Sequence, residues 1–445
     1  MPSCPDRLSC LALTATLLVG AAVASAGGRS VTLREAEEMA LERNPQVASA
    51  RAAVTGAKAG VTQARATILP NVSLGGGYTR NVELPVMFLP PPIGTRAIGD
   101  TNTYQLALNL NQPLFLGFAG ITGVHLAQTN RASAELGLEQ TRQSVISSVR
   151  EAYLGAVLAR STVRVQEEAV AQAESSLAQV QLRFNVGAAS GFDLLRARVQ
   201  LATIRPGLVS ARSNRDIADA QLRVAIGLEP TEPVMPSDTL AGFVSRWANL
   251  SVDSLIHVAY RNRPDLQQTE YQERRARDQV KLAQSPYYPM VSAYGRAQWQ
   301  AQSSKLSLKP DFIRSTSVGL NLSWTLWDSW KTPSGVQIAQ VGVRQVSYTM
   351  QLLRNAVAAE VEGTHLKLRE AAVNVQSEEQ TVGQAAEALR LARVLYAEGG
   401  STQLDVINAQ VALTQARTQY VQTLYQYHVA HIRLEKALGI IGRES

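Results

Sequence analysis

Residues 103–110 read TYQLALNL, and residues 317–326 read SVGLNLSWTL. In both stretches the even positions are apolar and the odd positions are polar or small. This two-residue period predicts β-strands with one apolar and one polar face. Weaker alternation through 71–79 and 290–301 predicts two further strands. Segments of about ten alternating residues are typical of a membrane β-barrel, although a half-buried strand of a soluble sandwich alternates in the same way.

Four strands are too few to pair their own edges or to enclose a core. In lipid each unpaired backbone group costs several kcal/mol, so an open sheet edge is not tolerated there. We therefore expect the chain to donate strands at about 71–84, 102–115, 290–302 and 315–327 to a barrel that several protomers share. The even, apolar positions would face the lipid. They include Leu106, Leu108, Leu110, Leu320, Leu322 and Trp324.

The chain is an internal duplication of a helix-strand-strand-helix-helix unit. Asn44-Pro45 in the first copy corresponds to Arg263-Pro264 in the second, and Gly187 corresponds to Gly399. The copies differ in length between about 80 and 103, which indicates a variable loop there. We divide the chain into a signal peptide (1–26), a first repeat (27–228), a Pro-rich belt (229–250) and a second repeat (251–445). The Pro-rich loop at 85–101 is either a stiffened loop or a lid over the barrel mouth.

Long helices dominate both copies. Residues 120–183 and 336–395 contain no proline, and the first range alone would extend about 95 Å as a helix. A coiled coil or a tunnel wall uses such a length, whereas a small globular domain does not. Turns at 185–192 and 397–404 each carry a glycine suited to a helix end, followed by a capping box. Each copy is therefore predicted to end in an antiparallel helical hairpin, and the fold class is mainly α with a membrane β-barrel.

Composition excludes several functions. An apolar run behind Arg7 ends at Ala24-Ser25-Ala26, which is typical of a secretory signal peptide. Cys4 and Cys10 lie inside this segment, so disulfides and thiol catalysis are not expected after its removal. The net charge of +7 comes from scattered basic residues without interleaved aromatics, so nucleic acid is not an expected partner. No motif for catalysis, a cofactor or a metal is found, and no enzyme is expected.

Several segments resemble the outer-membrane efflux proteins, the TolC-like family. The resemblance lies in the run from Asn44 to Val47, in 64–70, and in the tip segments 186–197 and 399–409. It implies a homotrimer with a twelve-stranded barrel in the outer-membrane lipid, continued by a long periplasmic helical barrel. It further implies an exit duct for substrates that an inner-membrane transporter passes on through a periplasmic adaptor protein.

The resemblance also assigns site residues at the tips. Asp405 matches a position whose carboxylate lines the periplasmic aperture, and Asn408 stands where the family can carry a second carboxylate. Asp193 and Tyr396 match residues that hold neighbouring tip helices together, and Ser401 stands where a basic tether can occur. The tip turns, where an adaptor would dock, contain Val186, Gly187, Gly399 and Gly400. Both aspartates could instead serve only as helix caps.

Three functions fit the sequence. The first is a duct for efflux of small molecules, and the second is the same duct for type I secretion of a protein. The third is a soluble periplasmic coiled-coil scaffold, which would not stay with the outer membrane on fractionation.

Overall fold

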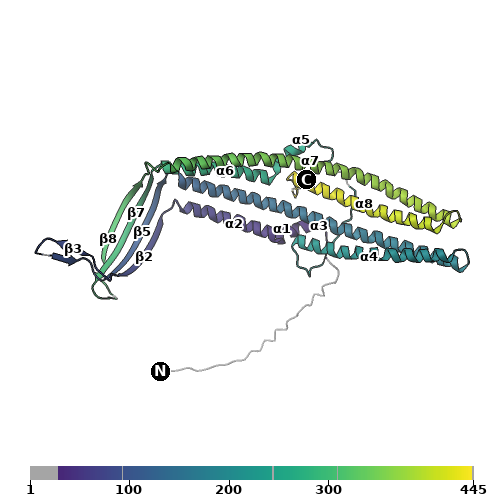
Figure 1. The fold of residues 1–445 in the computed structure, drawn as a ribbon, viewed down its shortest axis with the longest axis horizontal. Helices are drawn as coiled ribbons and strands as arrows, with labels where there is room; N and C mark the ends of the chain where they lie inside the picture. The colour runs from purple at the N-terminus through teal and green to yellow at the C-terminus, as the bar shows by residue number, and fades with distance from the viewer. Residues whose placement is uncertain (1–28, 93, 243–244, 308, 443–445) are drawn as a thin grey trace, which may run out of the picture.

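The computed structural model describes residues 29–92, 94–242, 245–307 and 309–442, so the predicted signal peptide lies outside the described residues. The protein is elongated (Figure 1). A β-sheet lies at one end, and the tight turns that connect antiparallel helices lie at the other. The sheet contains β2 (Asn71–Arg80), β5 (Asn102–Leu116), β7 (Met290–Ser303) and β8 (Ile313–Ser323), antiparallel and in that order. Its outer strands β2 and β8 come from different repeats, and in the described chain each pairs with one neighbour.

Two strands end earlier than the sequence predicts. The prediction for β2 extended to 84, but the strand stops at Arg80 and the chain turns toward Pro85, which has no backbone N–H for the ladder. The prediction for β8 extended to 327, but the strand stops at Ser323. The residues beyond it turn into the next helix, where Asp328 accepts a hydrogen bond from the backbone N–H of Thr332 at 2.8 Å.

Two pairs of short strands were not predicted. The variable loop contains a hairpin of β3 (Val86–Leu89) and β4 (Gly94–Ala97), which projects beyond the sheet (Figure 1). The other pair is β1 (Arg29–Val31) and β6 (Val234–Pro236), which run parallel. This pair ties the Pro-rich belt to the start of the first repeat.

Each repeat contributes four α-helices. The first has α1 (Leu33–Arg43), α2 (Pro45–Ala66), α3 (Ala119–Asn185) and α4 (Gly191–Ile226). The second has α5 (Val252–Asn262), α6 (Pro264–Gln284), α7 (Lys331–Ala397) and α8 (Gln403–Ala437), with the short 3₁₀ helix η1 (Ser285–Tyr287) after α6. Helices α3 and α7 have 67 residues each, which corresponds to about 100 Å. Helix α4 continues through Pro206.

Matching glycines join the helices in the two repeats. Gly227 ends α4 with φ +85°, and a Cβ on it would lie 2.9 Å from the Cα of Asn44. Gly439 follows α8 with φ +70°, and its Cβ would lie 2.9 Å from the Cα of Arg263. Asn44 and Arg263 are the equivalent residues between the two short helices of each repeat. Only glycine combines the left-handed backbone with this close approach.

The main cores lie where the short helices pack on the long ones. One cluster joins α1, α3 and α4, and a second joins α5, α7 and α8. The buried Tyr153 donates its hydroxyl to the carboxylate of Asp238 at 2.6 Å, which fixes the belt against α3. Arg150 contacts Glu37 at 2.6 Å and Glu435 at 2.8 Å, so one guanidinium links both repeats. The sheet and the tips therefore extend in opposite directions from a packed middle region.

Candidate functional site: a two-faced sheet and two helical tips

The strand register places the apolar rows on one face of the sheet. Leu74 pairs with Leu108, and Leu108 pairs in turn with Ala297. Partners in an antiparallel sheet point to the same side, so the predicted lipid-facing leucines of β5 and β8 share this face. It is uncovered in the protomer: Leu320 is 72% exposed and Leu322 is 66% exposed. An apolar surface of this extent marks an interaction site.

The opposite face is polar. A row across all four strands contains Ser73, Asn109, Arg296 and Ser317, and Gln298 lies in the next row. Arg296 lies near the middle of β7, where a guanidinium facing lipid would cost about 2–4 kcal/mol. The position of this charge indicates independently which face is turned away from lipid.

Aromatic side chains gather where the sheet joins the helices. The rings of Phe118 and Tyr288 meet edge-to-face at 5.1 Å between centroids, and those of Trp327 and Trp330 meet at 5.8 Å. Trp327 is 71% exposed. Phe118 and Trp330 occupy equivalent positions in the repeats, and both have φ +68°. The repeated strained turn presents rings outward at the level where barrel proteins carry an aromatic girdle.

Trp324 belongs to this girdle and not to a strand as predicted. It follows the last residue of β8, and its indole N–H donates to the backbone oxygen of Tyr287 at 3.2 Å. A register shift between Pro113 and Phe115 likewise brings the ring of Phe115 to the apolar face. Both side chains are thus placed by local irregularities that a strict two-residue period does not predict.

A second set of aromatics lies at the far end of the strands. Tyr78 and Tyr104 are paired with their centroids 5.1 Å apart, and Trp299 lies beneath the guanidinium of Arg314. The partners of Tyr104 and Phe115 on β7, Ala301 and Val291, are ten residues apart. At about 3.4 Å per residue and a strand tilt of about 40°, the two levels are about 26 Å apart along the barrel axis. This height fits the apolar band of about 25 Å of membrane barrels.

None of the helices in the described part of the chain combines the length and the apolar composition that crossing a bilayer takes.

The two helical tips have the same construction. Gly187 and Gly399 both have φ +79°, and the residue after each donates its backbone N–H to a carbonyl of the last helical turn. A capping box then begins the returning helix: Ser190 with Asp193 on α4, and Thr402 with Asp405 on α8. These bonds satisfy groups that helix ends otherwise leave unpaired. Val186 in the first turn is 78% exposed.

Asp405 is exposed and held in place by its own turn. One carboxylate oxygen accepts from the Thr402 hydroxyl at 2.6 Å, from the Thr402 backbone N–H at 2.8 Å and from the Ser401 hydroxyl at 3.1 Å. These hydrogen bonds, with that from the Thr402 hydroxyl first, lower the pKa of Asp405 below its ordinary value of 3.8. Asn408 is also exposed and follows three residues later, so it shares a helix face with Asp405.

A contact that sequence reasoning missed joins the two tips within one protomer. Arg183 donates to the backbone oxygen of Tyr396 at 3.2 Å, and its guanidinium lies 4.7 Å from the centre of the Tyr396 ring. The buried Gln403 donates to the hydroxyl of Ser176 at 3.1 Å nearby. The Asp193 carboxylate accepts hydrogen bonds from the backbone N–H and the hydroxyl of Ser190, and in the protomer Tyr396 is contacted by Arg183. The signal for this contact in the sequence is a single basic residue, Arg183, in the last turn of α3.

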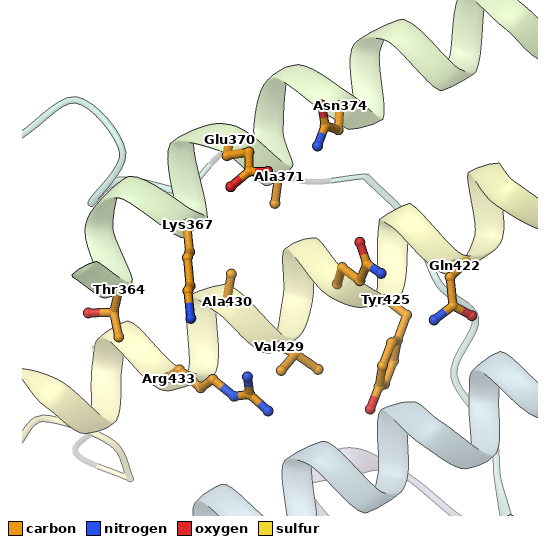
Figure 2. Close-up of a pocket in the computed structure, with 11 residues that line it drawn as sticks. Thr364, Lys367, Glu370, Ala371, Asn374, Gln422, Tyr425, Val429, Ala430 and Arg433 are labelled. Atoms are coloured by element: carbon orange, nitrogen blue, oxygen red, sulfur yellow. The ribbon is translucent and has the colours of Figure 1, made fainter. Parts of the chain in front are cut away.

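A hollow of about 430 Å³ lies between α7 and α8, lined by Lys367, Glu370, Tyr425 and Arg433 among others (Figure 2). Arg433 also pairs with Glu151 at 3.3 Å. Within the described residues, no group of three or more histidine, cysteine or acidic side chains is arranged to hold a metal ion.

Comparison with known proteins gives one family. Residues 37–228 and 255–440 match the family model described as outer membrane efflux protein. The chain is 24% identical over 423 residues to the outer membrane protein TolC of Salmonella enteritidis, which covers 93% of this chain and 82% of that protein. It is 23% identical over 350 residues to the alkaline protease secretion protein AprF of Pseudomonas aeruginosa, covering 77% and 71%.

Solved structures agree in fold. The Campylobacter jejuni CmeC outer membrane channel superposes with a TM-score of 0.75 at 16% identity, over 98% of this chain and 94% of that one.

Proposed function

We propose that this chain, which belongs to the outer membrane efflux protein family, forms the exit duct of a tripartite efflux system for small molecules. The family and the TolC-like fold predicted from the sequence are confirmed. The protein is an outer-membrane efflux channel that extends into the periplasm, and it is not an enzyme.

The two-faced sheet carries the proposal. Its apolar face is uncovered and its edge strands β2 and β8 are open, a combination that lipid does not tolerate in a lone protomer. Pairing β8 of one protomer with β2 of the next removes every edge. Three protomers give a closed barrel of twelve strands with leucines outward and amides inward. The long helices then continue the barrel as a periplasmic tunnel.

The tips are the proposed contact with the other components. Val186, Gly187, Gly399 and Gly400 form turns that protrude at the far end of the helices, where a periplasmic adaptor protein would dock. The adaptor would in turn engage an inner-membrane transporter. We assign Asp405 and Asn408 to the aperture between the three protomers. Asp193, Tyr396 and Ser401 are assigned to its closed state.

Fractionation and a transport assay test this function together. The protein should remain in the outer membrane after washing with high salt, and cells that lack it should retain a fluorescent dye that complemented cells expel. Detergent pull-down of the native complex should recover an adaptor and an inner-membrane transporter. Recovery of the chain in the soluble periplasmic fraction would support the coiled-coil scaffold instead.

Type I protein secretion is the second candidate, and the similarity to AprF favours it. A secretion duct uses the same barrel and tunnel, so the cargo distinguishes the two. Under this alternative, loss of the chain would remove a protein from the culture supernatant and leave dye retention unchanged. Small-molecule efflux predicts the reverse pattern.

A further inference from the structure

Arg296 is the charged residue of the polar sheet face. It lies six residues after Met290 and seven before Ser303, and its side chain is exposed. Asn109 faces it from β5 and Ser317 from β8, both neutral. No ion pair joins Arg296 to another of the described residues. Its charge is therefore not compensated within the protomer and acts on the space that the polar face lines.

No acidic residue compensates this charge within the sheet. The four strands, all of whose residues the structure describes, contain no aspartate or glutamate. Their other arginines, Arg80 and Arg314, lie at strand ends in the apolar rows. The neighbours of Arg296 along the polar rows are uncharged: amides, hydroxyls, glycine, alanine and a tyrosine ring.

We infer that Arg296 makes the barrel lumen selective for anions, so that negatively charged small molecules are the favoured cargo. This rests on the proposed trimeric duct, in which three copies of Arg296 form a ring at mid-height of the barrel. A ring of one sign inside low-dielectric walls raises the local concentration of the opposite ion. Arginine also binds carboxylate and phosphate groups with paired hydrogen bonds.

The size of such a barrel lets the charges act on the whole passage. Twelve strands about 4.8 Å apart and tilted by about 40° enclose a barrel about 24 Å across between backbones. The lumen radius is then close to the Debye length of about 10 Å at 0.1 M salt and well above that of about 3 Å at 1 M. Selectivity from Arg296 should thus be clear in dilute salt and weak in concentrated salt.

The proposed aperture has the opposite sign and lies far away. Asp405 is separated from the sheet by the length of α7, about 100 Å, so neither ring acts on the other. The described connections between strands at the outer end carry charges of both signs: Glu83, Asp100 and Asp311 are acidic, and Lys305 and Lys309 are basic. A probe applied from the extracellular side therefore reports on the barrel and not on the aperture.

The test is block of single channels by tripolyphosphate, a small polyvalent anion, added on the extracellular side in 0.1 M KCl. Arg296→Gln should raise the half-blocking concentration about fivefold or more, and the difference should shrink in 1 M KCl. Arg296→Lys should keep the block. Arg314→Gln, which removes an arginine from the apolar face, is the matched control and should leave the block unchanged.

A second variant guards against misassembly of the first. Asn109→Glu places a carboxylate directly opposite Arg296 and should weaken the block while keeping the arginine. Channels that form normally but show equal block in wild type, Arg296→Gln and Asn109→Glu would overturn the anion selectivity and leave the duct intact. A wild-type protein that forms no channels would refute the duct itself.

Discussion

Leu108→Arg should prevent insertion of the sheet into the membrane. Leu108 lies near the middle of β5 in the row that joins Leu74 to Ala297, and it is 40% exposed in the protomer. An arginine on the lipid face at mid-depth costs about 2–4 kcal/mol, and a trimer would carry it three times, about 6–12 kcal/mol in all. That is comparable with the whole stability of many folded domains.

The matched control is Asn321→Arg on the polar face. Asn321 pairs with Ser292, and neither faces a charged residue. Asn109, which the sequence alone suggests equally, is a poorer choice because an arginine there would stand opposite Arg296. Leu320→Arg should cost less than Leu108→Arg, because Leu320 is three residues from the end of β8 and the penalty falls toward the interface.

The assay is the fraction of protein recovered as an SDS-resistant trimer from outer membranes, with urea titration of the assembled fraction. We expect little trimer for Leu108→Arg and nearly wild-type amounts for Asn321→Arg. If both variants assemble equally well, the lipid and lumen faces are wrongly assigned and the barrel account fails.

Four further substitutions test the tips and the joint between helices. Asp405→Ala should weaken block by multivalent cations from the periplasmic side and Asn408→Asp should strengthen it in planar bilayers; unchanged block would leave Asp405 as a helix cap alone. Because the pKa of Asp405 is lowered below 3.8, its carboxylate is charged and caps the helix above pH 3.8. The charge and the cap are lost only as the pH falls through the still lower pKa of the folded protein. The block should therefore persist from pH 7 to about 5. Gly227→Ala should lower the free energy of unfolding by about 1–2 kcal/mol or more in a urea melt, whereas Gly56→Ala, which meets nothing within 4 Å, should not. Arg183→Ala should raise single-channel conductance because the link to Tyr396 is lost, and an unchanged conductance would show that this link does not restrain the tips.

The regular parts of the fold could be predicted because they repeat a local period. Alternation located the four long strands, and the absence of proline located α3 and α7 to within a few residues. The tips could be predicted because glycine and a capping box act over only a few residues, as at Gly399 and Asp405. Because the chain is duplicated, each element could be predicted from two segments of the sequence.

The features that could not be predicted depend on contacts distant in sequence or on broken periods. Arg183 and Tyr396 belong to different helical hairpins, and their contact exists only in the folded protein, where the two tips lie next to each other. The pairing of β1 with β6 likewise joins segments about two hundred residues apart. By sequence, Trp324 continues the alternation of β8. In the structure β8 ends at Ser323, and the chain leaves the sheet before α7 begins.

The most direct test of the account is the mass of the purified protein in detergent, measured by light scattering with the detergent contribution subtracted. The open edges of β2 and β8 and the uncovered leucines predict a trimer, three times the mass of the processed chain. A stable, monodisperse monomer would contradict the shared barrel, because one protomer with four strands cannot close its edges in lipid.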